Sequence, residues 1–208
     1  MKKKFKVVGS LTWFQRIVLI ILPILVVILA MGIGRMVISP VEVLKSTFEK
    51  FGYDYSVNPQ NEIVLWTIRF PRIILALLVG AGLSVAGCAF QSLFSNPLAT
   101  PDTLGVASGT SFGAALGILM GFSLIGIQFS ALLFGIIAVS LTYLSGTGKG
   151  HSINTIVLAG IMIGSLFSAL VSFTKFVADS ESQLPAITYW LMGSLSSASY
   201  KTLMLGAP

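Results

Sequence analysis

Long apolar runs separated by short polar stretches dominate this chain. Several of these runs reach about 20 residues, the length that a helix needs to cross a bilayer. The pattern predicts five complete transmembrane helices, over residues 14–35, 63–93, 103–121, 125–145 and 153–177, and the start of a sixth at about residue 199. We therefore expect an all-α protein, a polytopic transmembrane helical bundle with a single membrane domain over residues 1–208.

The polar segments indicate where the chain leaves the bilayer. Residues 35–62 form the longest hydrophilic stretch, and the amphipathic segment VEVLKSTFEKF within it predicts a short surface helix. The first apolar run could instead be a cleaved signal peptide. It is longer than the usual core of about 7 to 15 residues, however, and no A-x-A cleavage site follows it. We therefore expect this run to be a membrane span.

Composition narrows the class of protein further. Apolar residues make up 55% of the chain and charged residues only 10%, whereas soluble domains carry about 25% charged residues. A soluble enzyme, a disordered chain and a disulfide scaffold are thereby excluded. The net charge of +6 does not indicate a nucleic-acid partner, because much of it comes from a cluster before the first span, namely Lys2, Lys3, Lys4, Lys6 and Arg16. Such a cluster predicts a cytoplasmic N-terminus.

Chemically reactive side chains are scarce in the predicted spans. The chain has one histidine and one cysteine, and no carboxylate lies between Arg72 and Asp102. A metal site, a catalytic nucleophile with its base, or a proton relay would need such groups at depth. We expect no catalytic residue, no metal site and no cofactor, and therefore no enzyme activity in the chain itself.

Small residues recur at every fourth position in three of the predicted spans. The third span has the longest row, and rows of this spacing form a ridge on a helix surface. In lipid, small residues let two helix backbones approach closely. We expect helix packing, rather than contact with a substrate, at Gly105, Gly109, Gly113, Gly117 and Gly121. Shorter rows run through Ala76, Gly80, Ser84 and Cys88 and through Gly160, Gly164, Ser168 and Ser172.

The segment RFPR carries two arginines at one end of the second predicted span. Pro71 favours a helix start, where its missing N–H costs nothing. Arg69 and Arg72, three residues apart, would then lie on about the same helix face as a paired positive site at the membrane surface. The residues alone leave open whether the two arginines bind a partner or extend to lipid headgroups.

A proline-rich segment follows the second predicted span. Asn96-Pro97 and Pro101 interrupt the chain there, and Asp102 can cap the next helix. Asn96 could belong to a gate at the mouth of a bundle, or the segment could be only a tight turn.

Taken in order, these elements resemble the FecCD family, the iron-siderophore and cobalamin type of ABC importer permease. The resemblance rests on WTIRFPR, on QSLFSNPLATPDTLGVASG, and on the later segments INTIVLAGIMIGSLFSAL and ITYWLMGSLSSASY. It covers essentially residues 12–208. It implies a fold of the cobalamin-importer permease type, with about ten spans of about 20 residues each in the full family.

The resemblance also implies a function and partners. A multi-pass permease in the bacterial cell membrane would move an iron-siderophore complex into the cytoplasm, with haem and cobalamin as alternative cargoes. Its partners would be a second permease copy or paralogue, ABC ATPase subunits that hydrolyse ATP, an extracytoplasmic substrate-binding protein and membrane lipid, but no nucleic acid. The alternative from another class is a truncated membrane protein with a structural role and no transport.

Individual residues take roles from the same resemblance. Arg69 and Arg72 would meet acidic residues of the binding protein. Asn96 and Leu98 would belong to an inner gate, and Ser152 and Ile153 to a second constriction beside it. The family's segment that couples to the ATPase would follow the sixth span, so we expect this sequence to be the N-terminal part of a longer permease, truncated at its C-terminus.

Overall fold

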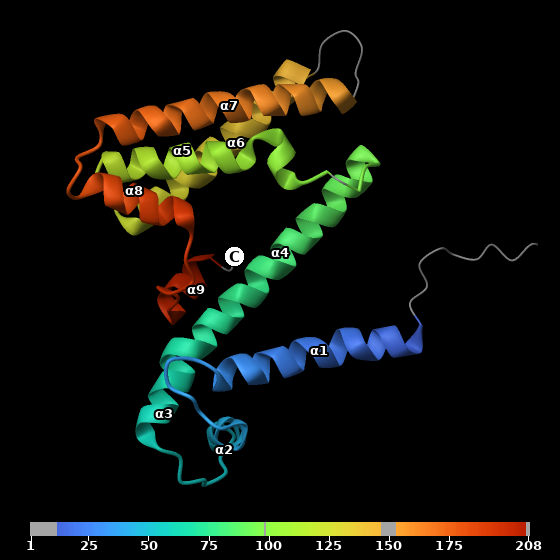
Figure 1. Cartoon of the computed structure of the whole chain (residues 1–208), viewed down its shortest axis with the longest axis vertical. Helices are drawn as coiled ribbons and strands as arrows, with labels where there is room; N and C mark the ends of the chain where they lie inside the picture. The colour runs from blue at the N-terminus through green and yellow to red at the C-terminus, as the bar shows by residue number, and fades with distance from the viewer. Residues whose placement is uncertain (1–11, 98, 147–152, 207–208) are drawn as a thin grey trace, which may run out of the picture. The chain divides into compact units, whose positions relative to one another are not determined.

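The computed structural model describes residues 12–97, 99–146 and 153–206. Two predicted gate residues, Leu98 and Ser152, lie outside these described residues, and the side chain of Ile153 is not described. Within the described part, every regular element is a helix (Figure 1). The prediction of an all-α fold is therefore confirmed. The chain divides into two compact units, residues 80–194 and the remainder, and each is described here by itself.

Among the described residues, four helical stretches are long and apolar enough to cross a membrane. They are Trp13–Gly32 (α1), Pro59–Phe94, Leu124–Gly146 (α6) and Asn154–Val177, the last within α7 (Ile153–Val177). Each overlaps a predicted span, so a multi-pass membrane protein is supported.

The predicted span over residues 103–121 differs from the helix found there. Helix α5 (Val106–Leu119) has 14 residues, which is about 21 Å at 1.5 Å per residue. The hydrocarbon core of a bilayer is about 30 Å thick. The helix is short because a 3-10 turn, η2 (Pro101–Leu104), precedes it and Gly105 then turns the chain with a φ of 72°. The count of five complete spans stays a prediction.

The first unit joins α1 to several short elements and to the beginning of the second long helix. Helix α2 (Pro40–Lys50) is the predicted surface helix, with the Ser39 hydroxyl as its N-terminal cap. The chain then forms α3 (Pro59–Ile63), a π-helical turn η1 (Val64–Arg69) and α4 (Phe70–Phe94). The unit's core consists of Met31, Ile38, Val43 and Leu65, with Val64, Trp66, Phe70 and Ile73 packed against it. Helix α9 (Tyr200–Gly206) belongs to the same unit.

The prediction that a helix starts at Pro71 is wrong. The helical stretch runs without a break from Pro59 to Phe94, and Pro71 lies inside it. A proline inside a helix has no N–H to donate and clashes with the carbonyl of the preceding turn. The wider π-helical turn comes just before it, with the Phe70 amide donating to the Leu65 carbonyl. The irregular hydrogen bonding thus falls next to the proline.

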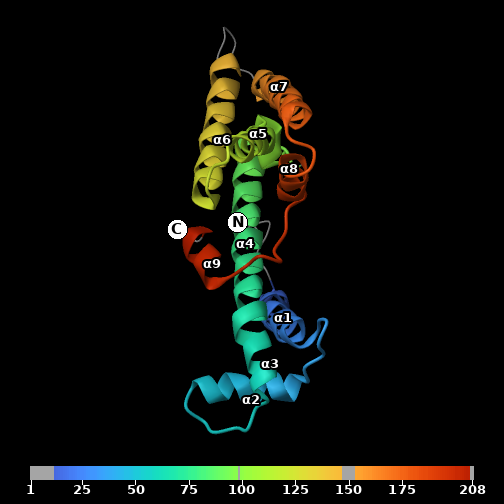
Figure 2. The same ribbon diagram turned by 90° about the vertical axis from the view of Figure 1, so that its left-hand side faces the viewer.

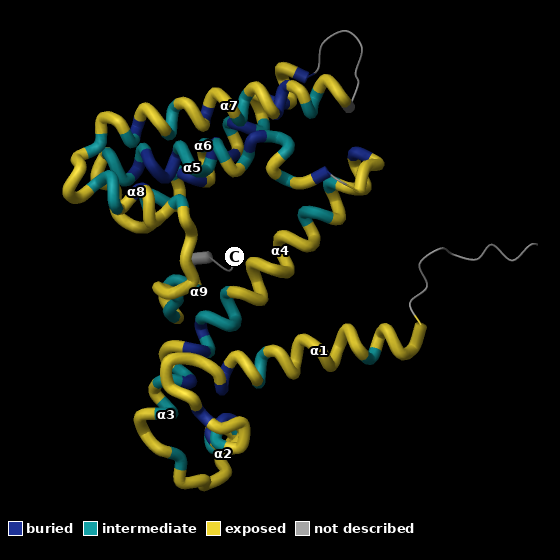
Figure 3. The backbone as a smooth tube through the Cα atoms, viewed as in Figure 1, coloured by how far each residue is buried: buried dark blue, intermediate teal, exposed yellow. Residues whose placement is uncertain are grey.

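The second unit is built around α5. This helix contacts α6, α7 and α8 (Gln183–Met192), and α7 also contacts η2 (Figures 1 and 2). Residues further along α5 meet residues earlier on α6: Gly109 lies against Phe134, Gly113 against Ser130 and Gly117 against Ile127. The two helices therefore run antiparallel. Figure 3 shows that dark, buried segments concentrate on α5, whereas most of α1 is exposed.

Candidate docking and gate sites

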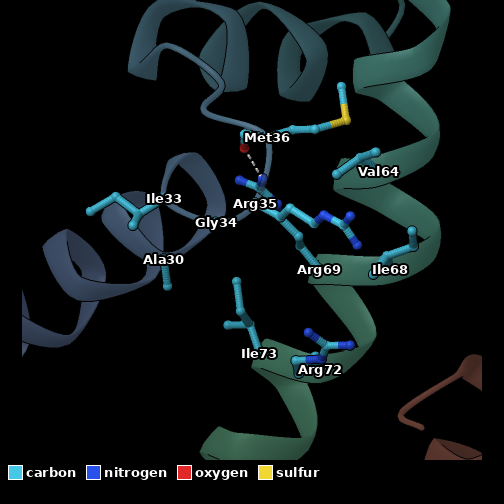
Figure 4. A pocket seen from close by; sticks show the side chains of 10 residues that line it. All are labelled: Ala30, Ile33, Gly34, Arg35, Met36, Val64, Ile68, Arg69, Arg72 and Ile73. Carbon is cyan, nitrogen blue, oxygen red and sulfur yellow. Dashed lines mark hydrogen bonds between the residues drawn. The ribbon is translucent and has the colours of Figure 1, made fainter. Parts of the chain in front are cut away.

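The predicted arginine site lies beside a pocket of the first unit. The pocket holds about 450 Å³, and ten described residues line it, among them Arg35, Arg69 and Arg72 (Figure 4). Apart from these arginines its walls are uncharged, and no aspartate or glutamate is among the ten. Both predicted arginines thus contribute to one positively charged pocket.

The two predicted arginines have different surroundings, although they are three residues apart. Arg69 is only 9% exposed. Its guanidinium donates one hydrogen bond to the Met31 carbonyl and another to the Met36 carbonyl. Figure 4 shows this side chain reaching from its helix to the connection that follows α1. Two nitrogens of the Arg69 guanidinium therefore already donate to backbone carbonyls.

Arg72 is half-buried, and its contacts come from the C-terminal segment of the same unit. Its Nε donates to the Leu195 carbonyl at 3.1 Å and its Nη2 to the Ser196 carbonyl at 2.9 Å. These bonds orient the guanidinium, but carbonyl oxygens carry no net charge to cancel its own. Arg35 is exposed, lines the same pocket and was not predicted as a site residue. Its position directly after the first apolar run was the available signal.

The predicted gate residue Asn96 lies at a second cavity, in the second unit. This cavity holds about 540 Å³ and is lined by uncharged residues, namely Phe94, Asn96, Ala99, Thr103, Asn154, Val157 and Leu158. Asn154 and Thr103 were not predicted. The polar pair Asn154-Thr155 at the beginning of an otherwise apolar helix was the signal for the first of them. The cavity thus combines two amides and one hydroxyl with apolar walls.

The backbone around Asn96 forms a turn. Ser95 has a positive φ of 47°, and the Ala99 amide donates to the Asn96 carbonyl at 3.1 Å. The prediction that Asp102 caps the next helix is wrong, because the N-cap of α5 is Gly105, which makes no side-chain cap. Asp102 lies instead in the 3-10 turn, where its carbonyl accepts from the Gly105 amide at 2.9 Å.

The five predicted packing glycines fall into two groups. Gly109, Gly113 and Gly117 are buried inside α5, where an added Cβ would press on α6. Gly105 and Gly121 lie outside the helix, at its two ends, with φ of 72° and 71°. An added Cβ at Gly105 would lie 2.9 Å from the Gly164 nitrogen of α7, whereas at Gly121 it would meet nothing within 4 Å. Three of the five glycines therefore form a packing ridge on α5, and the other two lie in the turns at its ends.

Two charged side chains outside the spans have pKa values that are shifted by a hydrogen-bonded neighbour. The hydroxyl and amide of Ser182 donate to the Asp179 carboxylate at 2.7 Å and 2.8 Å and lower the pKa of Asp179 below its ordinary value. The hydrogen bond from Lys50 to Glu62, at 2.6 Å, raises the pKa of Lys50. Among the described residues, no three His, Cys, Asp or Glu side chains gather into a metal site.

Apolar helices of spanning length, a closely packed glycine-lined helix pair and an uncharged cavity define this chain as a polytopic helical membrane protein. Its sequence is specific enough to assign it further. The chain belongs to the FecCD transport family, whose family model matches residues 20–208. The resemblance seen in the motifs is therefore confirmed.

Similar proteins include permeases with different cargoes. A molybdate import system permease protein of Haemophilus influenzae, MolB, is 37% identical over 89% of this chain and 55% of its own length. A Helicobacter pylori protein named as a probable iron chelatin transport system permease is 41% identical over 69% of this chain and 43% of its own. The chain thus spans about half the length of the curated relatives it matches.

A solved structure is similar in fold as well as in sequence. It is an ABC transporter that has been assigned to the metal-chelate type, in an inward-facing conformation. The TM-score is 0.75 at 36% identity, and the match covers 89% of this chain and 55% of the other. The fold of the cobalamin-importer type of permease is thereby supported.

Proposed function

We propose that this chain is part of the membrane-spanning permease subunit of a binding-protein-dependent ABC importer that moves an iron-siderophore complex into the cytoplasm. The observation that carries the proposal is the family match over residues 20–208. ATP hydrolysis would occur on separate ATPase subunits, and a second permease copy or paralogue would complete the pathway.

The cavity at Asn96 supports the proposal of a passage with uncharged walls for a bulky chelate. Its described lining has amide, hydroxyl and apolar groups but no charged group. Such walls offer hydrogen bonds to a chelate without holding it as tightly as an ion pair would. A molybdate oxyanion would gain more from a cationic wall. We therefore place an iron chelate before molybdate, with haem and cobalamin as alternative neutral-pathway cargoes.

The positive pocket of the first unit supports docking of an extracytoplasmic binding protein. Charged groups of one sign that face a partner steer association and set its orientation. Arginines with no described carboxylate partner would suit acidic side chains on that protein. On this proposal Arg69 and Arg72 face the outside of the cell, and Asn96, Leu98, Ser152 and Ile153 belong to the inner gate.

Uptake in cells tests the proposed cargo. The gene that encodes the chain would be deleted, and uptake of radioactive ferric siderophore, molybdate, haem and cobalamin would be measured with and without a plasmid copy. We expect siderophore uptake to fall and to return with the plasmid. A selective loss of molybdate, haem or cobalamin uptake would overturn the iron-siderophore proposal. No loss for any cargo would support a structural membrane protein instead.

A further inference from the structure

A π-helical turn changes the hydrogen bonding of the first unit's long helix just before Pro71. In η1, residues 64–69, amides donate to carbonyls five positions back, and at its end the Phe70 amide donates to the Leu65 carbonyl. Pro71 is fully buried and has no N–H to donate. The Trp66 carbonyl therefore receives no amide from the fourth or the fifth position after it.

The missing donor comes from a segment that is distant in the sequence. The Tyr200 hydroxyl donates to the Trp66 carbonyl at 2.6 Å, across 134 positions of the chain. Tyr200 is the first residue of α9, directly after a reciprocal cap. In this cap the Ser199 amide donates to the Thr202 hydroxyl at 2.8 Å, and the Thr202 amide donates to the Ser199 hydroxyl at 3.3 Å. Since a main-chain carbonyl away from water needs a donor, the Tyr200 hydroxyl completes the hydrogen bonding of the π turn.

The same segment is bonded to the long helix at a second point. Arg72 donates to the Leu195 carbonyl at 3.1 Å and to the Ser196 carbonyl at 2.9 Å. We call residues 195–200 the latch segment, and it belongs to the first unit together with the π turn. Three hydrogen bonds therefore hold the latch segment, one from the π turn's carbonyl and two from the arginine that follows Pro71.

On the other side of the π turn, the chain is bonded to the surface helix α2. The Trp66 indole N–H donates to the Ser46 hydroxyl at 2.9 Å, and Ser46 is only 1% exposed. The Asn61 side-chain amide donates to the Glu42 carboxylate at 2.8 Å. If the extra residue of the π turn were lost, the residues before it would rotate by about 100°, because an α-helix has 3.6 residues per turn. The bonds to α2 therefore depend on the π register.

We propose that Tyr200 selects the π register over the α register, and that the latch segment thereby controls the attachment of α2. In the α register the Phe70 amide would donate to the Trp66 carbonyl, but the Pro71 ring would press on the Thr67 carbonyl and leave it without an amide. Each register thus leaves one carbonyl without an amide donor. Tyr200 supplies the donor that the π register lacks. Withdrawal of its hydroxyl should convert the turn to α-helix and rotate the indole away from α2.

The arrangement couples two places that are not in contact through one turn. A displacement of the latch segment removes the hydroxyl from the Trp66 carbonyl, the turn changes register, and the bond from the indole to Ser46 breaks. Neither a substrate nor a partner protein takes part in these steps. The inference therefore goes beyond the proposed transport function and does not rest on it.

The Trp66 indole N–H reports on the register. The full chain in nanodiscs would carry 15N-labelled tryptophan, whose three residues give three indole signals, and Trp66→Phe identifies the one concerned. Tyr200→Phe removes the hydroxyl and keeps the ring. It should speed hydrogen exchange of this indole about tenfold, as expected for a lost hydrogen bond, and shift its signal in the direction that Ser46→Ala does. Tyr189→Phe, at an exposed position of α8, should change neither.

Pro71→Ala provides a second variant that acts on the same turn. Alanine supplies an amide and removes the ring, so the α register no longer has a clash or a carbonyl without a donor. We expect Pro71→Ala to change the Trp66 indole as Tyr200→Phe does, although the Tyr200 hydroxyl is still present. The double variant should show no larger change than either single variant, because both substitutions act on one equilibrium.

The outcomes decide whether the register carries the coupling. If Tyr200→Phe leaves the exchange and the signal of the Trp66 indole unchanged, the latch is wrong. If Tyr200→Phe changes them and Pro71→Ala does not, or if the two effects add, Tyr200 acts without a change of register and the proposal is overturned. Equal and non-additive effects support it. If Tyr200→Phe does not fold, an unchanged indole in Pro71→Ala still overturns the proposal.

Discussion

Replacing Gly113 with alanine should weaken the contact between α5 and α6. An added Cβ would lie 2.8 Å from the Ser130 carbonyl carbon and 2.9 Å from the Phe134 Cβ, and it would also press on the Ser130 carbonyl oxygen. Optimal separations are about 3.5 to 4.0 Å. Two of these three atoms belong to the backbone, so they cannot move aside as the end of a flexible side chain would. The helices must therefore separate.

The size of the effect follows from three contributions. Overpacking a close contact costs about 1 to 3 kcal/mol. The Ser130 hydroxyl donates to the Gly113 carbonyl at 2.6 Å, and such interhelical bonds in membranes are worth about 0.6 to 1.7 kcal/mol. Alanine is favoured over glycine inside a helix by about 0.5 to 1 kcal/mol, which offsets part of the loss. We expect a net destabilisation of about 0.6 to 4 kcal/mol.

Gly82 provides a matched control on α4. An added Cβ there meets nothing within 4 Å, so Gly82→Ala should gain only the helix preference of about 0.5 to 1 kcal/mol. Because the helix preference is common to both variants, they should differ by about 2 to 5 kcal/mol. The assay is unfolding of the purified chain in mixed micelles by added dodecyl sulfate, followed by circular dichroism. Equal free energies of unfolding for Gly113→Ala and the wild type would refute the close-contact argument.

Three further predictions concern other parts of the chain. Thr142 is fully buried and its hydroxyl donates to the Leu104 carbonyl at 3.0 Å, so Thr142→Val should cost about 1 to 3 kcal/mol in the same unfolding assay. Ser140→Ala, at an exposed position, should cost little; equal losses for both would contradict the role of that bond. The lowered pKa of Asp179 means that its contribution to stability is present above the ordinary value of 3.8 and is lost as the pH falls through the lower, folded value. The protection of the Ser182 amide, measured as its exchange rate relative to that of an unstructured peptide at the same pH, should accordingly fall in acid. Asp179→Asn should abolish this pH dependence of the protection, whereas an unchanged profile would exclude the carboxylate as the cause. Asn154→Phe should fill the uncharged cavity and block siderophore uptake while the protein still inserts; normal uptake would exclude a pathway through it.

The helices themselves could be predicted from the apolar runs, for a general reason. In a bilayer, backbone N–H and C=O groups must bond within the chain, so a long apolar run can hardly be anything but a helix. The predicted spans at 14–35, 125–145 and 153–177 accordingly lie within a few residues of the helices Trp13–Gly32, Leu124–Gly146 and Ile153–Val177.

Helix ends were harder to predict, because they depend on local hydrogen bonding. Pro71 looked like a helix start, yet a π-helical turn carries the helix past it. Gly105 and Gly121 followed the every-fourth spacing of the α5 glycines, yet both have a positive φ and lie in turns. Spacing cannot tell a glycine that packs from a glycine that turns the chain.

The class of protein follows from the sequence alone, because apolar runs and the ordered motifs are sufficient to identify a helical membrane protein of the FecCD transport family. The surroundings of single residues depend on how distant segments of the chain fold together. Arg69 and Arg72 are equivalent in the sequence, but the first bonds to carbonyls of residues 31 and 36 and the second to carbonyls of residues 195 and 196. These acceptors come from distant segments, so no local pattern around the arginines could reveal which guanidinium is buried.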